Sequence, residues 1–115
     1  MTDLAKVYLL AADTIRRNGH TKGDYYSLPE SAVGILRGRC ESPVCAAGAL
    51  SVVVCGDPIP YFDGEFDLVI RDFASRTLGD YSGDVVIAVA NWNDTPERTP
   101  ADVIAAFEQA AKEAA

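Results

Sequence analysis

Residues 42–55, with the sequence SPVCAAGALSVVVC, decide which of two folds this chain adopts. The stretch holds no charged residue and is apolar on nearly every side of a helix, so it belongs in the core in either conformation. Ser42 in a capping position and Pro43 in the first helical position favour a helix that ends at Cys55. The β-branched run at 52–54 favours a buried strand instead. We predict the helix, with a strand at 51–55 as the alternative.

The region before this stretch carries two further helix signals. The first helix is predicted to be capped by Thr2-Asp3 and to end at Asn18-Gly19, with apolar residues recurring every three or four positions. Its inward-facing residues are Leu4, Val7, Tyr8, Ala11, Ala12 and Ile15. The tetrapeptide Ser27-Leu28-Pro29-Glu30 is a capping box, which predicts a short helix that fades near Gly38.

Three more helices are predicted after the stretch. Asp63 is placed to cap one that ends at Leu78-Gly79, and Thr99 opens a capping box for the last one. Residues 85–92 form the helix between them, with a strand at 85–90 as the alternative. The apolar faces comprise Phe66, Val69, Ile70 and Phe73 in one helix and Val103, Ile104, Phe107, Ala110 and Ala111 in the other. We therefore predict a single domain over residues 1–115, an irregular all-α bundle of five or six short helices. The alternative is an α+β fold with a small sheet from 51–55 and 85–90.

The formal net charge is −7, from 10 Lys and Arg against 17 Asp and Glu in 115 residues. Residues 1–55 carry six basic and five acidic side chains, whereas residues 56–115 carry four basic and twelve acidic ones. This balance disfavours direct binding to nucleic acid or to an anionic membrane, because both need a local density of Lys and Arg.

The acidic half of the chain carries the first candidate site. Residues 57–84 hold seven acids against two arginines and include the aromatic, proline-rich loop at 58–62. Candidate contact residues for a protein partner are Tyr61, Phe62, Asp63, Glu65 and Asp67. The interpretation that we favour is structural: the acids form a solvated face, and the loop presses onto the core.

The segment WNDTPERT at residues 92–99 carries the second candidate site. In the structural interpretation, which we favour, Trp92 fills the core, Asn93 or Asp94 ends a helix by bonding its own backbone, and Thr99 caps the next helix. Arg98 then reaches Asp94 or nearby carbonyls. In the functional interpretation, Asn93, Asp94 and Arg98 bind a polar ligand beside the wall formed by Trp92.

The residue types that carry metal or catalytic chemistry show no recognisable spacing. The three cysteines and the single histidine lack the paired spacing of a zinc site, and no phosphate-binding loop or calcium loop is present. We predict no metal, no cofactor and no catalytic residue. The longest uncharged apolar run, residues 43–55, is shorter than the roughly 20 residues of a membrane span. An odd number of cysteines favours reduced thiols in a bacterial cytoplasm.

Three blocks of this sequence carry a family resemblance: AADTI and GHTKG in residues 11–23, SPVCAAGAL in residues 42–50, and WND, RT and DVI in residues 92–104. They resemble an uncharacterised family of small proteins in actinobacteria and their phages. The resemblance implies a cytoplasmic helical protein of phage origin and supplies no catalytic residues. His20 departs from the pattern, which has an aromatic residue, often tryptophan, at this position. The acidic stretch after Gly56 has no counterpart.

These observations favour a non-enzymatic protein-interaction module, phage-encoded or accessory, that binds a host protein through its acidic surface. The alternative is a polar-ligand-binding or enzymatic domain that uses Trp92, Asn93, Asp94 and Arg98. A weaker alternative is a nucleic-acid mimic. A homodimer is a further possibility, although no heptad pattern predicts one.

Overall fold

The computed structural model describes residues 2–27, 41–61, 64–79 and 83–115, and the chain is helical through most of these ranges. The helices are α1 (Leu4–Asn18), α3 (Ala46–Cys55), α4 (Gly64–Leu78), α5 (Val85–Asp94) and α6 (Pro100–Ala114). The predicted all-α class is therefore confirmed. The alternative with strands at 51–55 and 85–90 is wrong, because both segments are helical.

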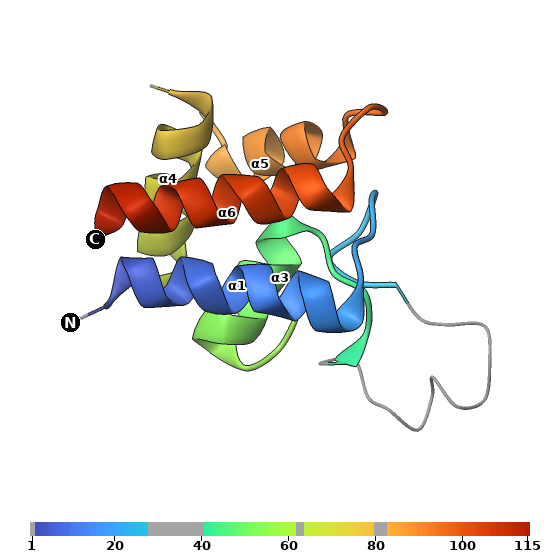
Figure 1. The fold of residues 1–115 in the computed structure, drawn as a ribbon, viewed down its shortest axis with the longest axis horizontal. Helices are drawn as coiled ribbons and strands as arrows, with labels where there is room; N and C mark the ends of the chain where they lie inside the picture. Colours follow the sequence, from blue (N-terminus) through green and yellow to red (C-terminus); the bar gives the residue numbers. More distant parts are fainter. Residues whose placement is uncertain (1, 28–40, 62–63, 80–82) are drawn as a thin grey trace.

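The first and last helices form one side of the molecule. Figure 1 shows α1 and α6 side by side and running in opposite directions, and these two helices make the most extensive contact of any pair. Arg16 Nη2 and Glu108 Oε2 join them by an ion pair at 2.6 Å. The central helix α3 packs against α1, α4 and α5, and α4 also packs against α5 and α6.

Aromatic side chains fill the space between these helices. Phe73 of α4 and Phe107 of α6 are fully buried, with their ring centroids 4.7 Å apart, and Tyr8 of α1 lies 5.8 Å from Phe73. The four predicted inward residues of α4 and all but one of those of α6 are buried, the exception being the partly buried Ile104. Trp92 packs edge-on against Phe73 but is also only partly buried, so it closes the core from outside rather than filling it.

Most of the predicted helix ends are confirmed where the structure describes them. Asp3 caps α1 by accepting a hydrogen bond from Lys6 N–H, and the helix ends at Asn18 as predicted. Thr99 and Asp102 form the predicted capping box of α6. The predicted helix after Ser27 and the predicted cap at Asp63 fall outside the described residues.

The start of α3 differs from the prediction. Ser42 does not cap this helix and Pro43 is not its first residue, because the helix begins at Ala46 with Cys45 as its N-cap. The Cys45 sulfur accepts a hydrogen bond from Gly48 N–H at 3.3 Å, a role for which hydroxyl and carboxylate side chains are the usual choice.

The physical reason for the later start is a competing set of backbone hydrogen bonds. Val44 donates its N–H to Gly19 C=O and accepts from Thr21 N–H, and Cys45 N–H donates to Tyr25 C=O. These bonds hold 44–45 extended against the loop at residues 19–27, which a local capping rule does not take into account. No helix in the described ranges has the length and the apolar character needed to cross a bilayer.

A candidate binding groove

The carboxamide of Asn93, near the end of α5, connects three parts of the chain. Its side chain is fully buried, and Oδ1 accepts hydrogen bonds from Ala46 N–H at 2.9 Å and from His20 Nε2 at 2.6 Å. Its Nδ2 donates to Thr21 C=O at 3.1 Å and to Asp94 Oδ1 at 2.9 Å. The three sequence blocks that carry the family resemblance therefore meet at one amide group.

The backbone partners fix the orientation of this amide. Ala46 N–H can only donate and Thr21 C=O can only accept, so Oδ1 must face the former and Nδ2 the latter. His20 therefore carries its proton on Nε2.

Further contacts tie the loop at 19–27 to the end of α5. Asp94 Oδ1 accepts a hydrogen bond from Gly23 N–H at 3.0 Å. Lys22 Nζ donates to the carbonyls of Thr95 at 2.7 Å and Pro96 at 3.3 Å, in the turn just after α5. A cation is favourable near the C-terminus of a helix. The loop is thus held at a defined distance from α5.

The other side of the loop rests directly on α3. A β-carbon added to Gly48 would lie 2.1 Å from Tyr25 C=O, which is closer than any side chain allows. Only glycine at this position lets the backbone of the loop approach the first turn of α3. This approach places Tyr25 beside Cys45.

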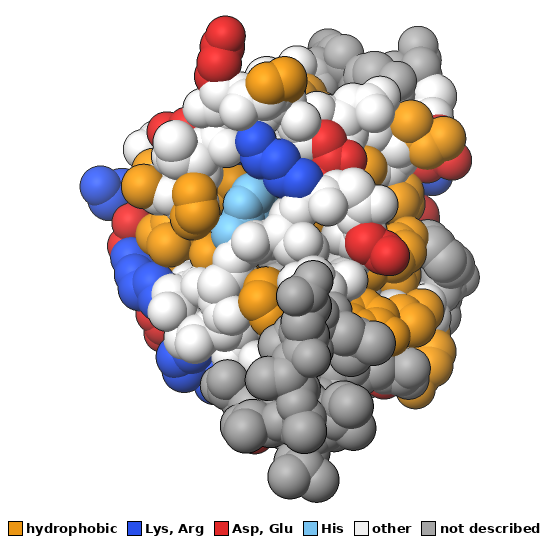
Figure 2. All heavy atoms as spheres, turned by 90° about the vertical axis from the view of Figure 1, so that its right-hand side faces the viewer, with side chains coloured by type: hydrophobic (Ala, Val, Ile, Leu, Met, Phe, Trp, Pro, Cys, Tyr) orange, Lys and Arg blue, Asp and Glu red, His pale blue; other side chains and the backbone are white. Residues whose placement is uncertain are grey.

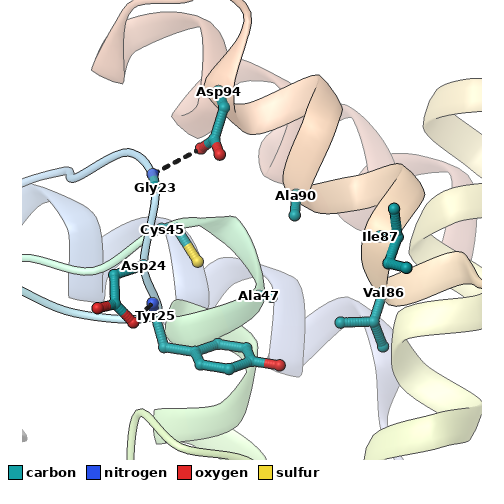
Figure 3. A pocket seen from close by; sticks show the side chains of 9 residues that line it. All are labelled: Gly23, Asp24, Tyr25, Cys45, Ala47, Val86, Ile87, Ala90 and Asp94. Atoms are coloured by element: carbon teal, nitrogen blue, oxygen red, sulfur yellow. Dashed lines mark hydrogen bonds between the residues drawn. The ribbon is translucent and has the colours of Figure 1, made fainter.

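A pocket of about 270 Å³ opens between the loop, the start of α3 and one face of α5. Figure 3 shows the Tyr25 ring on one side, Ile87 and Val86 opposite, and Asp94 at the far end. The Cys45 sulfur points into the space between them. The lining residues are Gly23, Asp24, Tyr25, Cys45, Ala47, Val86, Ile87, Ala90 and Asp94.

Two side chains of the pocket, Cys45 and Tyr25, have raised pKa values. Burial raises the pKa of the Cys45 thiol, with the negative charge of Asp94 as a further cause. Burial also raises the pKa of the Tyr25 phenol, and the thiol of Cys45 and the carboxylates of Asp84 and Asp24 add to this effect. Cys45 is therefore a thiol and not the thiolate that nucleophilic catalysis requires.

A second, larger hollow of about 500 Å³ continues from the pocket towards α4. The two share Tyr25, Val86 and Ile87 as a common wall. The second hollow is completed by Asp67, Arg71, Asp84 and Val85. We call the two hollows together the α5 groove. It joins Asp94 and Asp67, which the sequence analysis had assigned to two separate candidate sites.

Negative charge predominates along the α5 groove. Asp24, Asp84, Asp94 and Asp67 line it, and among the described residues that line it Arg71 alone is a Lys or Arg. Asp67 is paired with Arg71 at 2.9 Å, which leaves three carboxylates without an ion pair among the described residues. The view in Figure 2, onto the end of the molecule that carries the loop, shows acidic, basic and apolar side chains interspersed.

The remaining residues of the 92–99 segment lie apart from this groove. Arg98 stacks on Trp92 with its guanidinium carbon 4.4 Å from the ring centroid, and its Nε donates to Trp92 C=O at 2.9 Å. Both line a different hollow of about 440 Å³ with Leu78, Ala88, Asn91 and Thr95. Asn93 is inaccessible, so one ligand cannot contact Trp92, Asn93, Asp94 and Arg98 together. Neither Asn93 nor Asp94 ends the helix through its own backbone, as the structural interpretation had proposed; both side chains bond elsewhere.

The loop after α3 combines both interpretations that the sequence allowed. Pro58 and Pro60 are buried, whereas Ile59 and Tyr61 are 42% and 61% exposed. Glu65 is exposed in the first turn of α4, and Phe62 and Asp63 fall outside the described residues. Neither Tyr61 nor Glu65 lines the α5 groove.

Sequence reasoning missed the apolar wall of the groove, which Tyr25, Val86, Ile87 and Ala90 provide. One signal was present: residues 85–90 are apolar on more faces than a helix needs for one buried contact. The excess face of α5 is the one that lines the groove, and Ile87 remains 55% exposed there.

Comparison with known proteins identifies one family. The model of a family described as "Family of unknown function (DUF6197)" matches residues 1–113. No curated protein matches the chain, and neither does any solved structure.

Proposed function

We propose, on the premise that this chain belongs to the DUF6197 family of unknown function, that it is a non-enzymatic protein-interaction domain. It binds a basic segment of a partner protein in the α5 groove. The observation that carries this proposal is the continuity of the groove: two hollows share one apolar wall, and carboxylates line both of them.

The shape and composition of the groove favour a protein segment over a small metabolite. The pocket at the Asp94 end of the groove, at about 270 Å³, is smaller than the roughly 300–1,000 Å³ of a usual small-molecule site. A protein segment instead spreads its contacts over a longer surface, with an apolar centre and a polar rim. Tyr25 and Ile87 provide such a centre, and Asp24 and Asp84 provide the rim.

The neutral Cys45 thiol and the hydrogen bond of His20 favour a binding role over catalysis. The Cys45 thiol is neutral and accepts a hydrogen bond from Gly48 N–H, and the ring Nε2 of His20 is used by Asn93. A thiol and an imidazole in these roles do not form a nucleophile and its base.

A second candidate function is favoured by the stacked pair of Arg98 and Trp92. Their hollow, about 440 Å³ in volume, has the size of a small-molecule site and presents a guanidinium beside an indole. This arrangement suits a small anionic ligand.

The arrangement of the acids on α4 does not favour the nucleic-acid mimic. A mimic needs its acidic side chains on one face, whereas Asp72 contacts Tyr8 and Arg76 on a side of α4 away from Asp67.

The proposed place of action is the cytoplasm of a bacterial host, with the chain as an accessory or phage-encoded protein that binds a host protein. This part of the proposal rests on the resemblance of the three sequence blocks to actinobacterial and phage proteins. A second copy of the chain is an alternative partner. Light scattering at increasing protein concentration distinguishes a homodimer from a monomer that binds a different protein.

Selection of short peptides from a displayed random library tests the main proposal. We expect the selected peptides to combine Lys or Arg with apolar residues and to shift the NMR signals of Gly23, Ile87 and Ala90. Ile87→Lys places a cation in the groove at an exposed position and should weaken the binding of these peptides by about tenfold or more. Leu9→Lys, at a similarly exposed position on α1, is the matched control. Equal loss in both variants, or selected peptides whose signals map to α1, would contradict the proposal.

A further inference from the structure

We propose that the pocket at the Asp94 end of the α5 groove holds one arginine side chain of the partner. This inference rests on the proposed function and specifies the chemistry of the segment that binds. Its basis is the size of the pocket, its apolar walls and the Asp94 carboxylate at its far end.

The size of the pocket suits one long side chain. Its volume of about 270 Å³ lies below the range of whole small-molecule ligands. Tyr25 stands on one side and Val86, Ile87 and Ala90 on the other, so an unbranched aliphatic stem contacts apolar surface along its length (Figure 3). Arginine can bury such a stem against apolar surface while its guanidinium contacts polar groups or water.

The Asp94 carboxylate, at the far end of the pocket, has capacity left for that charged end, whereas the Asp24 carboxylate points to the other side of the loop (Figure 3). Asp94 Oδ1 already accepts hydrogen bonds from Gly23 N–H and Asn93 Nδ2, and Asp24 Oδ1 accepts from Tyr25 N–H. Within the described ranges of the chain, Oδ2 of Asp94 receives no hydrogen bond. The contact with Gly23 also fixes the position of the Asp94 carboxylate, so little side-chain entropy is lost when a cation binds it.

A guanidinium fits this pocket better than an ammonium ion. It is planar and more weakly hydrated, it stacks on aromatic rings, and its several N–H groups reach two acceptors at once. The pocket provides these partners in the Tyr25 ring and the two carboxylate oxygens of Asp94. An ammonium ion would lose its strong hydration against walls that are largely apolar.

A pair of peptides tests the inference: acetyl-Leu-Gly-Arg-Gly-Leu-amide and the same peptide with citrulline, which keeps the shape but not the charge. In NMR titrations, we expect the arginine peptide to shift the amide signals of Gly23 and Ala90 and to bind about tenfold or more tightly than the citrulline peptide. Asp94→Asn keeps an oxygen for Gly23 N–H and should abolish this difference. Asp13→Asn, which removes the same charge from the exposed surface of α1, should preserve it.

The outcomes separate this inference from the proposed function. Equal binding of the two peptides in the groove would overturn the arginine inference and leave the protein-binding groove in place, as would an Asp94→Asn variant that still prefers arginine. Shifts confined to the Asp67 end would also overturn the inference. If neither peptide shifts the signals of the groove, the inference fails, and the peptide-library selection then decides whether the groove binds protein segments of other chemistry.

Discussion

Asn93 Oδ1 accepts a hydrogen bond from the backbone N–H of Ala46 at 2.9 Å, although the two residues are 47 positions apart in the sequence. Ala46 is the first residue of α3, and the first N–H groups of a helix have no partner within it. Asn93 therefore acts as a cap supplied by a different helix. The same amide fixes the loop at 19–27, so the end of α5, the start of α3 and one wall of the groove are positioned together.

Replacement of Asn93 tests this role. Asn93→Ala removes the partner of the buried Ala46 N–H, the partner of the partly buried Thr21 C=O and the acceptor for His20. We expect the free energy of unfolding to fall by about 3 kcal/mol, because buried polar groups without a partner are destabilising. Urea unfolding followed by circular dichroism measures the change. Asn91→Ala, on the exposed side of α5, should stay within about 0.5 kcal/mol of the wild type. A loss at Asn93 no larger than this would refute the capping role.

Enlargement of Gly48 tests the close contact between the loop and α3. Gly48→Ala brings a methyl group against Tyr25 C=O, and backbone must move to relieve the overlap. We expect a destabilisation of about 2 kcal/mol, together with shifted NMR signals for Gly23 and Tyr25. Gly64→Ala, where an added β-carbon meets nothing within 4 Å, is the control and should be neutral or stabilising. Unchanged stability and unchanged loop signals in Gly48→Ala would show that the contact is not tight.

The environment of the Tyr8 hydroxyl leads us to expect a loss of stability at alkaline pH. Burial raises the pKa of Tyr8 above its ordinary value of 10.0, and its hydrogen bond to Asp72 adds to this effect. Because the pKa is raised, the folded state retains the proton. The contribution of Tyr8 to the free energy of unfolding is therefore fully present below about pH 10 and is lost as the pH rises further.

Urea titrations between pH 8 and 11.5, values chosen to bracket roughly the ordinary tyrosine pKa, measure this effect. The wild-type free energy of unfolding should decline above about pH 10, with Tyr8 contributing a slope of up to about 1.4 kcal/mol per pH unit. Tyr8→Phe should show a shallower decline. Tyr61→Phe should behave as the wild type, because this ring is exposed to water. Parallel slopes in Tyr8→Phe and the wild type would disprove the assignment.

The protonated state of Cys45 predicts low reactivity. Burial raises the pKa of this thiol and also restricts access to it, whereas Cys55 is partly exposed. Peptide-resolved mass spectrometry after iodoacetamide treatment at neutral pH should find Cys45 modified about tenfold or more slowly than Cys55. Addition of urea should bring the two rates together. Faster modification of Cys45 in the folded protein would indicate an activated thiol and would reopen the case for catalysis.

Local sequence signals predicted the helices well because they act within a few residues. Asp3 and Thr99 satisfy N–H groups three positions away, and the buried faces of α4 and α6 follow the period of a helix. The predicted cap of α3 was wrong because local signals take no account of distant segments. Ser42 is a good local cap, but residues 44–45 form hydrogen bonds with a loop some twenty residues earlier in the chain.

The candidate site was predicted only in fragments. Asp94 and Asp67 were both singled out, but as members of different sites, and nothing local relates α4 to α5. Asn93 and Asp94 are adjacent in sequence, yet successive residues on a helix point about 100° apart. One side chain is therefore buried as a structural connection, and the other lines the groove.

By itself, the sequence determined that the chain is helical, where most of its helices end, which faces are buried, and that its charge is concentrated in residues 56–115. Capping and amphipathic periodicity are short-range effects, and a single sequence displays them directly. Only the tertiary structure decided where α3 begins, which residue of the 92–99 segment is inaccessible, and that Tyr25, Ile87 and Asp94 line one groove. These features depend on hydrogen bonds and packing between segments that are far apart in the chain, and no local pattern encodes those distances.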